Sequence, residues 1–260
     1  MNVAASAVVQ AFDRAAAGYD AEFGANPIGL LFRSVVQERL LELMPEGARV
    51  LDVGCGTGED ALALAERGRR LHAVDAAPAM ARLCAEKAAA RGLGSERLAV
   101  ECRAAEGLLA LELEFDGAYS NFGALNCAEL HLTGEGLRRL LKPGAPLLVS
   151  VMGRRPLPAG LQRALTGRGG ARGRALPRVG GLPVPVHHPG LGGLREQLGP
   201  GFAWTRAYAL GVLVPSPEHG AWAQRHPMTF GVLAALERSV RGWPLLRHLG
   251  DHLVLEGVRT

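Results

Sequence analysis

The stretch from Val50 to Gly58, with the sequence VLDVGCGTG, constrains the fold of this chain more than any other. An apolar run that carries an acid, Asp52, leads into three glycines at alternate positions. This pattern is typical of a buried strand that turns tightly into a helix. Glycine adopts backbone conformations that other residues avoid, and it leaves no side chain between the main chain and a ligand. The stretch therefore predicts a ligand-binding turn that includes Gly54, Cys55, Gly56 and Gly58.

The residue that follows the turn restricts the kind of ligand. Glu59 stands where a dinucleotide-binding fingerprint has its third glycine, and a carboxylate there repels phosphate. A nicotinamide-dependent oxidoreductase is therefore disfavoured. An acidic turn without a phosphate suits a nucleoside that carries a cationic centre.

Asp75 is the strongest single candidate for binding such a nucleoside. It ends the predicted second strand, Leu71 to Asp75, and open parallel sheets bind ligands at the carboxyl ends of their strands. A carboxylate there can accept hydrogen bonds from both ribose hydroxyls. The alternative role, which is compatible with binding, is to cap the helix that begins near Pro78.

The glycine turn closely resembles motif I of the class I S-adenosylmethionine-dependent methyltransferases, and the run from Ser120 to Cys127 is similar to one in a type-11 subgroup of that family. The resemblance covers residues 8–152 and implies S-adenosylmethionine as the cofactor. It also implies a methyl transfer to a small molecule. The implied donor-binding residues are Asp52, Gly54, Cys55, Gly56, Gly58, Asp75, Ala76, Met80, Ala105, Glu106, Ser120 and Asn121, with Ala76, Ala77 and Met80 beside the adenine.

One position departs from the family pattern. Ala104 stands where the family usually has an aspartate that binds the adenine amino group, so main-chain groups around Ala105, or the side chain of Glu106, remain for that task. The departure slightly favours a second hypothesis, in which the chain is a catalytically inactive module that binds S-adenosylmethionine. Release of S-adenosylhomocysteine with time distinguishes an enzyme from such a module.

The expected fold is a doubly wound α/β domain with a seven-stranded, mostly parallel sheet and an antiparallel C-terminal strand. Within one domain, 1–260, we expect lid helices at 1–45, the donor-binding core at 46–152, an insertion or cap at 153–201, and closing strands and a helix at 202–260. Predicted strands are 50–53, 71–75, 98–102, 115–121, 146–152, 202–214 and 252–258. Predicted helices are 8–20, breaking at Gly18, then 28–43, 59–67, 191–198 and 220–241.

Methyl transfer requires few catalytic side chains, because the donor is already activated and the protein mainly aligns the acceptor. Four residues are candidate bases for removing an acceptor proton: Tyr19, His131, His187 and His188. Adjacent residues of an extended segment point to opposite sides, so one of the two neighbouring histidines at most faces the site. A surface or structural role is the alternative for each histidine. The sequence has no cluster of histidines or cysteines with metal-ligand spacing.

Composition limits the remaining possibilities. With 260 residues, 48% of them hydrophobic, the chain can bury the core of one globular domain. The four cysteines are widely spaced and read as reduced thiols of a cytoplasmic protein. We expect no signal peptide and no membrane-spanning segment. The oligomeric state and the acceptor are not predictable from the sequence.

The positive charge is concentrated in one segment. Residues 153–178 contain seven arginines and no acid, whereas the rest of the chain has 22 basic and 25 acidic residues. A nucleic-acid partner is therefore not expected. The segment leaves the strand 146–152 at its carboxyl end, so we expect it to favour a negatively charged acceptor; a solvated loop is the alternative.

Overall fold

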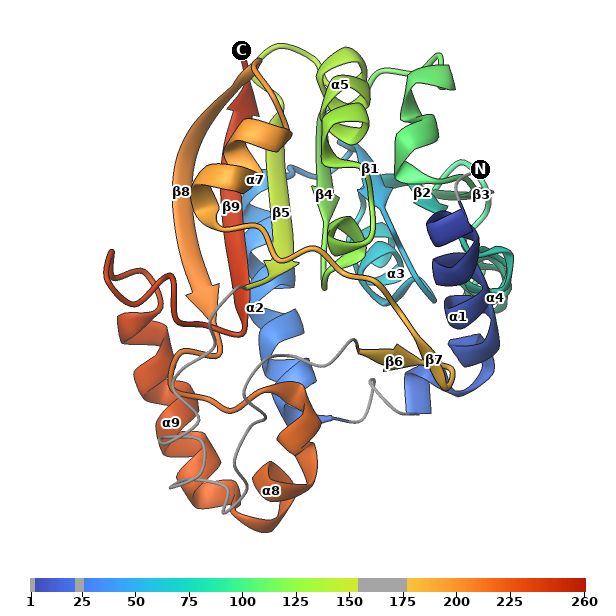
Figure 1. Ribbon diagram of the computed structural model, residues 1–260. Helices are drawn as coiled ribbons and strands as arrows, with labels where there is room; N and C mark the ends of the chain where they lie inside the picture. Colours follow the sequence, from blue (N-terminus) through green and yellow to red (C-terminus); the bar gives the residue numbers. More distant parts are fainter. Residues whose placement is uncertain (1–2, 22–25, 154–176) are drawn as a thin grey trace.

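The computed structural model of the chain describes residues 3–21, 26–153 and 177–260. Its centre is a seven-stranded sheet in the order β3-β2-β1-β4-β5-β9-β8 (Figure 1). The strands are β1 (Arg49–Val53), β2 (Arg70–Asp75), β3 (Leu98–Cys102), β4 (Gly117–Ser120), β5 (Pro146–Met152), β8 (Phe202–Leu210) and β9 (His252–Arg259). The first five pair in parallel, whereas β9 runs antiparallel to both β5 and β8. The predicted doubly wound sheet with its antiparallel C-terminal strand is confirmed.

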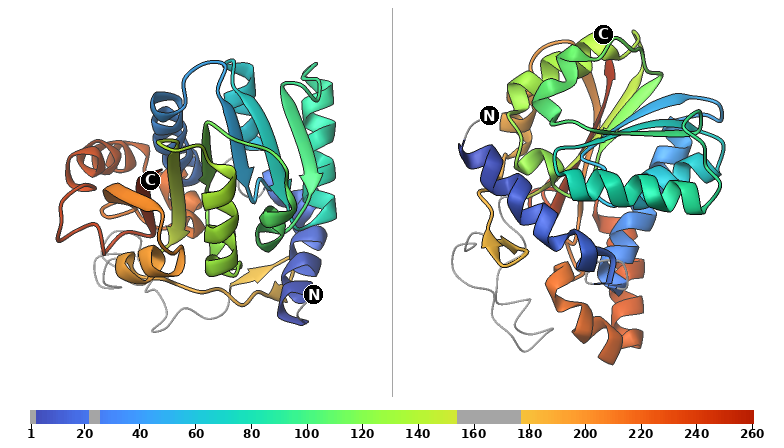
Figure 2. Two further views of the ribbon diagram at one scale, coloured as in Figure 1. Left: turned by 90° about the horizontal axis from the view of Figure 1, so that it is seen from above. Right: turned by 90° about the vertical axis from the view of Figure 1, so that its right-hand side faces the viewer.

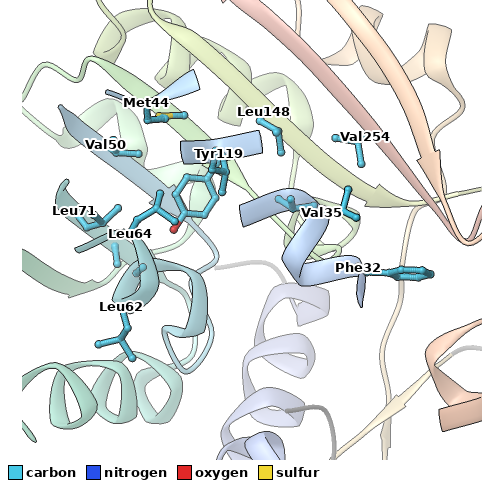
Figure 3. Packing of buried hydrophobic residues seen from close by; sticks show 14 of the residues in the cluster. Phe32, Val35, Met44, Val50, Leu62, Leu64, Leu71, Tyr119, Leu148 and Val254 are labelled. Atoms are coloured by element: carbon cyan, nitrogen blue, oxygen red, sulfur yellow. The ribbon is translucent and has the colours of Figure 1, made fainter. Parts of the chain in front are cut away.

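Helices cover both faces of the sheet, and each face has its own apolar core. Val50 packs in one core and Leu51 in the other, as expected for a strand that is buried on both faces. The Val50 core is covered by α2 (Pro27–Leu43), α3 (Glu59–Glu66), α4 (Pro78–Ala90) and α8 (Gly220–Arg225). The Leu51 core is covered by η2 (Ala105–Ala110), α5 (Leu130–Leu140) and α7 (Leu191–Gln197). Figure 3 shows the Val50 core, where Tyr119 of β4 lies among side chains from the sheet, α2 and α3.

The first helix, α1 (Val3–Tyr19), packs on α4 and on the hairpin formed by β6 (Arg178–Val179) and β7 (Leu182–Pro183). Figures 1 and 2 show α1 and this hairpin side by side, near the end of the sheet to which the arrow of β5 points. Segments from the two halves of the chain therefore meet at the carboxyl edge of the parallel strands.

Three predicted element ends are wrong. Gly18 does not break α1, which continues to Tyr19. The fourth strand is shorter than predicted, because Phe115 makes only an isolated bridge with Leu141 before β4 begins. The strand predicted to reach residue 214 ends at Leu210, because Gly211 follows with a φ of +76° that does not continue an extended strand.

The helix predicted at 220–241 is two helices, α8 and α9 (Pro227–Val240). The break falls at His226, because Pro227 has no amide hydrogen and its ring disfavours a helical conformation in the residue before it. Both helices project from one end of the molecule (Figures 1 and 2), and α9 exposes Met228 and Val232 to solvent. In the described ranges no helix combines the length and apolar character needed to cross a bilayer.

The arginine-rich segment falls between β5 and β6. Residues 154–176 lie outside the described residues, so the predicted contact of this segment with an acceptor stays a prediction. Its last arginine, Arg178, is exposed in β6, where its Nε donates to the carbonyl oxygen of Gly181 over 3.3 Å.

Candidate functional site

The turn after β1 has the geometry that its glycines predict. Gly54, Gly56 and Gly58 have φ values of +81°, +55° and +87°, in the left-handed region. A Cβ atom on Gly54 would lie 2.1 Å from the Cβ of Ala124, and one on Gly58 would lie 2.3 Å from the Sγ of Cys84. A Cβ on Gly56 meets no atom within 4 Å. The turn is therefore packed on two sides and open at its middle glycine, where a ligand can approach the main chain.

Asp75 links the ends of β1 and β2. Its Oδ2 accepts a hydrogen bond from the Gly56 amide over 2.8 Å, and its Oδ1 accepts one from the Ala77 amide over 2.9 Å. Burial raises the pKa of Asp75, and the two amide donors oppose that rise. The carboxylate thus supports both the glycine turn and the start of α4. Each oxygen keeps a second lone pair that a hydroxyl of a ligand can use.

Asp52 lies beneath the turn. It is 2% exposed, and its Oδ2 accepts a hydrogen bond from the Tyr119 hydroxyl over 2.8 Å. Burial raises the pKa of Asp52 well above its ordinary value, and the nearby carboxylates of Asp60 and Asp75 add to that rise. Three acids in one small volume favour a ligand with positive charge.

The segment after β4 is fixed by side chains that sequence reasoning assigned to the donor. The Ser120 hydroxyl donates to the carbonyl oxygen of Val53 over 2.7 Å, which ties β4 to β1. Asn121 donates from Nδ2 to Asp60 Oδ2 over 3.0 Å and accepts the Phe122 amide at Oδ1 over 2.9 Å. Phe122 has a φ of +52°, which non-glycine residues rarely adopt. These contacts of Ser120 and Asn121 therefore shape the loop, and a direct contact with a ligand stays a prediction.

Phe122 lies between two side chains that sequence reasoning missed. The Arg33 guanidinium of α2 lies 4.9 Å from the Phe122 ring centre, and Arg33 Nη1 lies 3.0 Å from Asp60 Oδ1. On the other side the His252 ring packs edge-on against Phe122 at 5.6 Å, and its Nδ1 lies 2.9 Å from Asp251 Oδ2. No local sequence pattern brings α2, β4 and β9 together. Of these three residues, only Phe122 could be located from the sequence, because it directly follows the predicted strand 115–121.

The end of α1 closes on the glycine turn. Asp20 accepts a hydrogen bond from the Thr57 hydroxyl over 2.5 Å at Oδ1 and from Lys87 Nζ over 2.8 Å at Oδ2. Lys87 also pairs with Glu59. Burial acts to raise the pKa of Asp20, but the hydrogen bonds from Lys87 and Thr57 outweigh it and lower that pKa. The turn, α1 and α4 are therefore joined by one charged cluster.

The comparisons with known proteins identify the family. Residues 50–144 match a family described as "Methyltransferase domain". A malonyl-[acyl-carrier protein] O-methyltransferase of Erwinia pyrifoliae is 31% identical over 207 residues, which cover 78% of this chain and 70% of that protein. The chain belongs to the class I S-adenosylmethionine-dependent methyltransferases. S-adenosylmethionine is the cofactor of this family.

Two further proteins extend the comparison. A malonyl-[acyl-carrier protein] O-methyltransferase of Methylovorus sp. is 33% identical over 156 residues, 56% of this chain and 50% of that protein. The chain spans about half the length of several of the curated relatives it matches. The structure of the magnesium protoporphyrin IX methyltransferase of Synechocystis PCC 6803, with bound S-adenosylhomocysteine, superposes with a TM-score of 0.58 at 17% identity, over 96% of this chain and 94% of that one. This likeness shows the methyltransferase fold.

The donor cradle of this methyltransferase fits S-adenosylmethionine. The open side of Gly56 leaves room for a ligand against the main chain, and the acids around it suit a cationic donor. A hydrogen bond to Cys84, together with burial, raises the pKa of the Cys55 thiol, so Cys55 is neutral in the turn. The described residues contain no group of three or more potential metal ligands.

The residues predicted to lie beside the adenine have different surroundings. Met80 is buried in a small cluster with Ala77 and Ala16, and Tyr19 packs against it from α1. Ala76 accepts a weak contact from the Cys102 thiol at its carbonyl oxygen, and Ala105 packs on the Leu51 core. Glu106 accepts the Glu129 amide at the start of α5 over 2.8 Å. One oxygen of Glu106 is thus committed to α5, and its predicted role at the adenine stays a prediction.

The four candidate bases lie in different surroundings. His131 is 71% exposed on α5, 3.9 Å from Glu135, and is not brought to the cradle. His187 is exposed, and its amide donates to the carbonyl oxygen of Asn126. His188 is half-buried, with Nδ1 3.4 Å from the carbonyl oxygen of Met152 at the end of β5. The two neighbouring histidines therefore differ in exposure. Tyr19, the fourth candidate, packs at the end of α1 against the cluster that contains Met80.

Proposed function

We propose that this protein transfers a methyl group from S-adenosylmethionine to a small-molecule acceptor by in-line displacement. The observation that carries the proposal is the open cradle formed by Gly56 and Asp75. The Asp75 carboxylate, at the end of β2, bonds the turn and keeps lone pairs for the hydroxyls of a ribose, while the side of Gly56 is open to a ligand. The bound donor supplies an activated methyl group on a positively charged sulfur. The task left to the protein is to hold, orient and enclose the reactants.

The residues of the cradle divide that task. Main-chain groups of the turn and the spare lone pairs of Asp75 hold the nucleoside, and the acidic side chains beside the turn favour the cationic end. Asp20 ties the end of α1 to the turn through Thr57. Correct alignment of reacting groups contributes about 7 to 11 kcal/mol in well-oriented intramolecular reactions, so the scaffold itself is the main catalyst.

Phe122 and its neighbours form the acceptor side in this proposal. The ring is held between Arg33 and His252 at the strand end next to the cradle, which gives the acceptor a fixed apolar surface. Where the acceptor must lose a proton, we propose Tyr19 or His188 as the base, because Tyr19 ends α1 beside Met80 and His188 lies next to the end of β5.

Binding and turnover test the proposal separately. Titration calorimetry with S-adenosylhomocysteine is expected to show binding at one site, and a ligand at 100 times its dissociation constant stabilises the fold by about 2.7 kcal/mol. Mass spectrometry of reactions with a library of small acids, phenols and amines is expected to show S-adenosylhomocysteine formed together with a product heavier by one methylene.

The second candidate function is binding without transfer. It is favoured by Ala104, which is exposed and has no carboxylate for the adenine amino group. Tight binding of the nucleoside with no methylated product from any acceptor would support this module. Absence of binding at millimolar concentration would contradict both functions.

A further inference from the structure

A cavity of about 260 Å³ lies beyond the end of β5, apart from the glycine turn. Gly153 borders it directly after β5, and Leu253 borders it from β9. Pro189 and Leu191 contribute apolar surface from the segment that leads into α7. Arg247 closes it from the loop between α9 and β9. His248, next to Arg247, also lines the cavity, so its wall is mostly apolar but contains an arginine and a histidine.

Contacts connect this cavity to the proposed acceptor side. Asn126, in the segment after β4, accepts the Met152 amide at Oδ1 over 2.8 Å, and its Nδ2 donates to the carbonyl oxygens of Met152 and His187. Met152 directly precedes Gly153, and His187 stands two residues before Pro189. The bonds of Asn126 therefore hold the chain next to two residues of the cavity wall. The Gly153 amide donates to the carbonyl oxygen of Asp251 over 2.8 Å. The loop after β4 therefore fixes two walls of the cavity.

The Arg247 side chain makes no hydrogen bond to any residue that the structure describes. Its Nε is buried without a partner there, whereas its main-chain amide donates to the carbonyl oxygen of Trp243 over 3.0 Å. A buried donor without a partner is unfavourable, and more so when it carries charge. The nearest acid along the chain, Asp251, instead accepts the Ser216 hydroxyl and lies beside His252.

We propose that this cavity binds the anionic end of the acceptor, a carboxylate or phosphate, through the Arg247 guanidinium. The planar guanidinium presents donors in a geometry that matches either anion. Pockets for whole small molecules usually have about 300 to 1,000 Å³, so a cavity of 260 Å³ takes one end of an acceptor rather than all of it. Pro189, Leu191 and Leu253 place apolar surface in the same wall, which strengthens the interaction relative to open water. This inference rests on the proposed function and adds to it the charge of the substrate.

The test compares Arg247→Gln with Arg225→Gln. Arg225 is an exposed arginine of α8 whose Nε bonds only the carbonyl oxygen of Ala221, so it controls for the loss of one positive charge. Protein saturated with S-adenosylhomocysteine is titrated with malonate in one series and with inorganic phosphate in another, at 150 mM salt. We expect the parent and Arg225→Gln to bind at least one anion equally, and Arg247→Gln to bind it at least tenfold more weakly. The two series show whether a carboxylate or a phosphate is preferred.

Equal anion affinity in the parent and Arg247→Gln would overturn the inference, as would equal losses in both variants or no binding of either anion to the parent. Arg247→Lys keeps the positive charge but loses the planar pair of N–H donors of the guanidinium, and we expect it to bind the anion with an intermediate affinity. It also provides a folded variant if Arg247→Gln is unstable. Affinity for S-adenosylhomocysteine is measured in every variant. If the parent does not bind S-adenosylhomocysteine, the proposed function is rejected. If the parent binds it but Arg247→Gln does not weaken anion binding, only the anion site is rejected.

Discussion

The carboxylates of this protein show how one residue type takes different roles according to its surroundings. Asp52 is buried against Tyr119, and its pKa is raised well above the ordinary value. Asp116 is partly exposed, and its pKa is lowered, first by its hydrogen bond from Lys142, with burial acting in the opposite sense. Asp75 lies between these extremes, with two amide donors. All three residues are aspartates in the sequence, and their different roles follow from burial and hydrogen-bond partners that only the fold creates.

Asp75→Ala is expected to weaken both donor binding and the fold. The substitution removes the acceptors for the Gly56 and Ala77 amides, and hydrogen bonds to a charged group contribute about 1.5 to 3 kcal/mol each. We expect at least a tenfold loss of affinity for S-adenosylhomocysteine, measured by calorimetry, and a lower midpoint in urea. Because these two bonds join the turn after β1 to the start of α4, the carboxylate is expected to contribute to folding as well as to binding. Unchanged affinity in a folded variant would reject the assignment of Asp75 to the ribose.

Asp52→Asn is expected to change how stability depends on pH. Because the folded pKa of Asp52 is raised above its unfolded value of about 3.9, the carboxyl group stabilises the fold when it is protonated. That contribution is lost as pH rises through the folded pKa. Asparagine keeps an oxygen for Tyr119 and does not titrate.

Urea denaturation between pH 4 and 8 measures this effect. We expect the stability of the parent relative to Asp52→Asn to fall as pH rises from about 4 and to level off above the folded pKa. Parallel pH profiles of the two proteins would contradict the raised pKa. The same variants, titrated with S-adenosylhomocysteine, test the predicted contact of Asp52 with the donor.

Among the helices and strands, those that a local sequence pattern determines could be predicted. The run from Val50 to Gly58 and the strand ending at Asp75 could be placed because apolar stretches, glycines and acids follow one another along the chain. Pro227 is a local signal as well, and its effect on the helix was predictable from its missing amide hydrogen. The contacts of Arg33 and His252 with Phe122 could not be predicted, because they join elements that only the completed sheet brings together.

Glu237→Gln is expected to loosen α9. The buried Glu237 carboxylate accepts the amides of Val212 and Leu213 over 2.9 and 2.7 Å, and that of Val214 over 3.3 Å. Glutamine retains one acceptor oxygen and turns an amide group towards the remaining donors, so we expect a loss of about 1 to 3 kcal/mol in the free energy of unfolding.

Glu218→Gln is the matched control for this substitution, because Glu218 is exposed and pairs only with His219 at 3.8 Å. Hydrogen exchange is expected to increase at 212–214 and along α9 in Glu237→Gln alone. Equal exchange in both variants would show that the carboxylate does not hold α9 in place.

At the scale of the whole molecule, the sheet separates two regions of the carboxyl edge. The cradle for the donor lies at β1 and β2, under the end of α1, and the cavity for the anion lies at β5 and β9. The loop after β4 lies between them and is bonded to both, through Asn121 to Asp60 and through Asn126 to Met152. The two proposals together place the methyl transfer beside the loop after β4, between the two regions.

Asp20→Ala is expected to speed the release of the donor without unfolding the protein. Asp20 is the residue by which α1 reaches Thr57 and Lys87, so its loss frees the end of α1 from the turn. Its side chain is 45% exposed, and pairs of this kind contribute only about 0.2 to 1 kcal/mol to stability. The melting temperature is therefore expected to change little. Dissociation of S-adenosylhomocysteine, followed by stopped-flow competition, is expected to become several times faster.

Asp116→Ala provides the control for this last prediction. Asp116 also pairs with a lysine, Lys142, over 2.7 Å, but it precedes β4 and so lies at the opposite edge of the sheet from the cradle. A general effect of removing a paired carboxylate would change both variants alike. Faster release in Asp20→Ala alone would show that α1 holds the donor in place, because the two substitutions remove the same chemistry at opposite ends of the parallel strands. Equal release rates in the parent and Asp20→Ala would instead mean that the donor leaves by a route that α1 does not close.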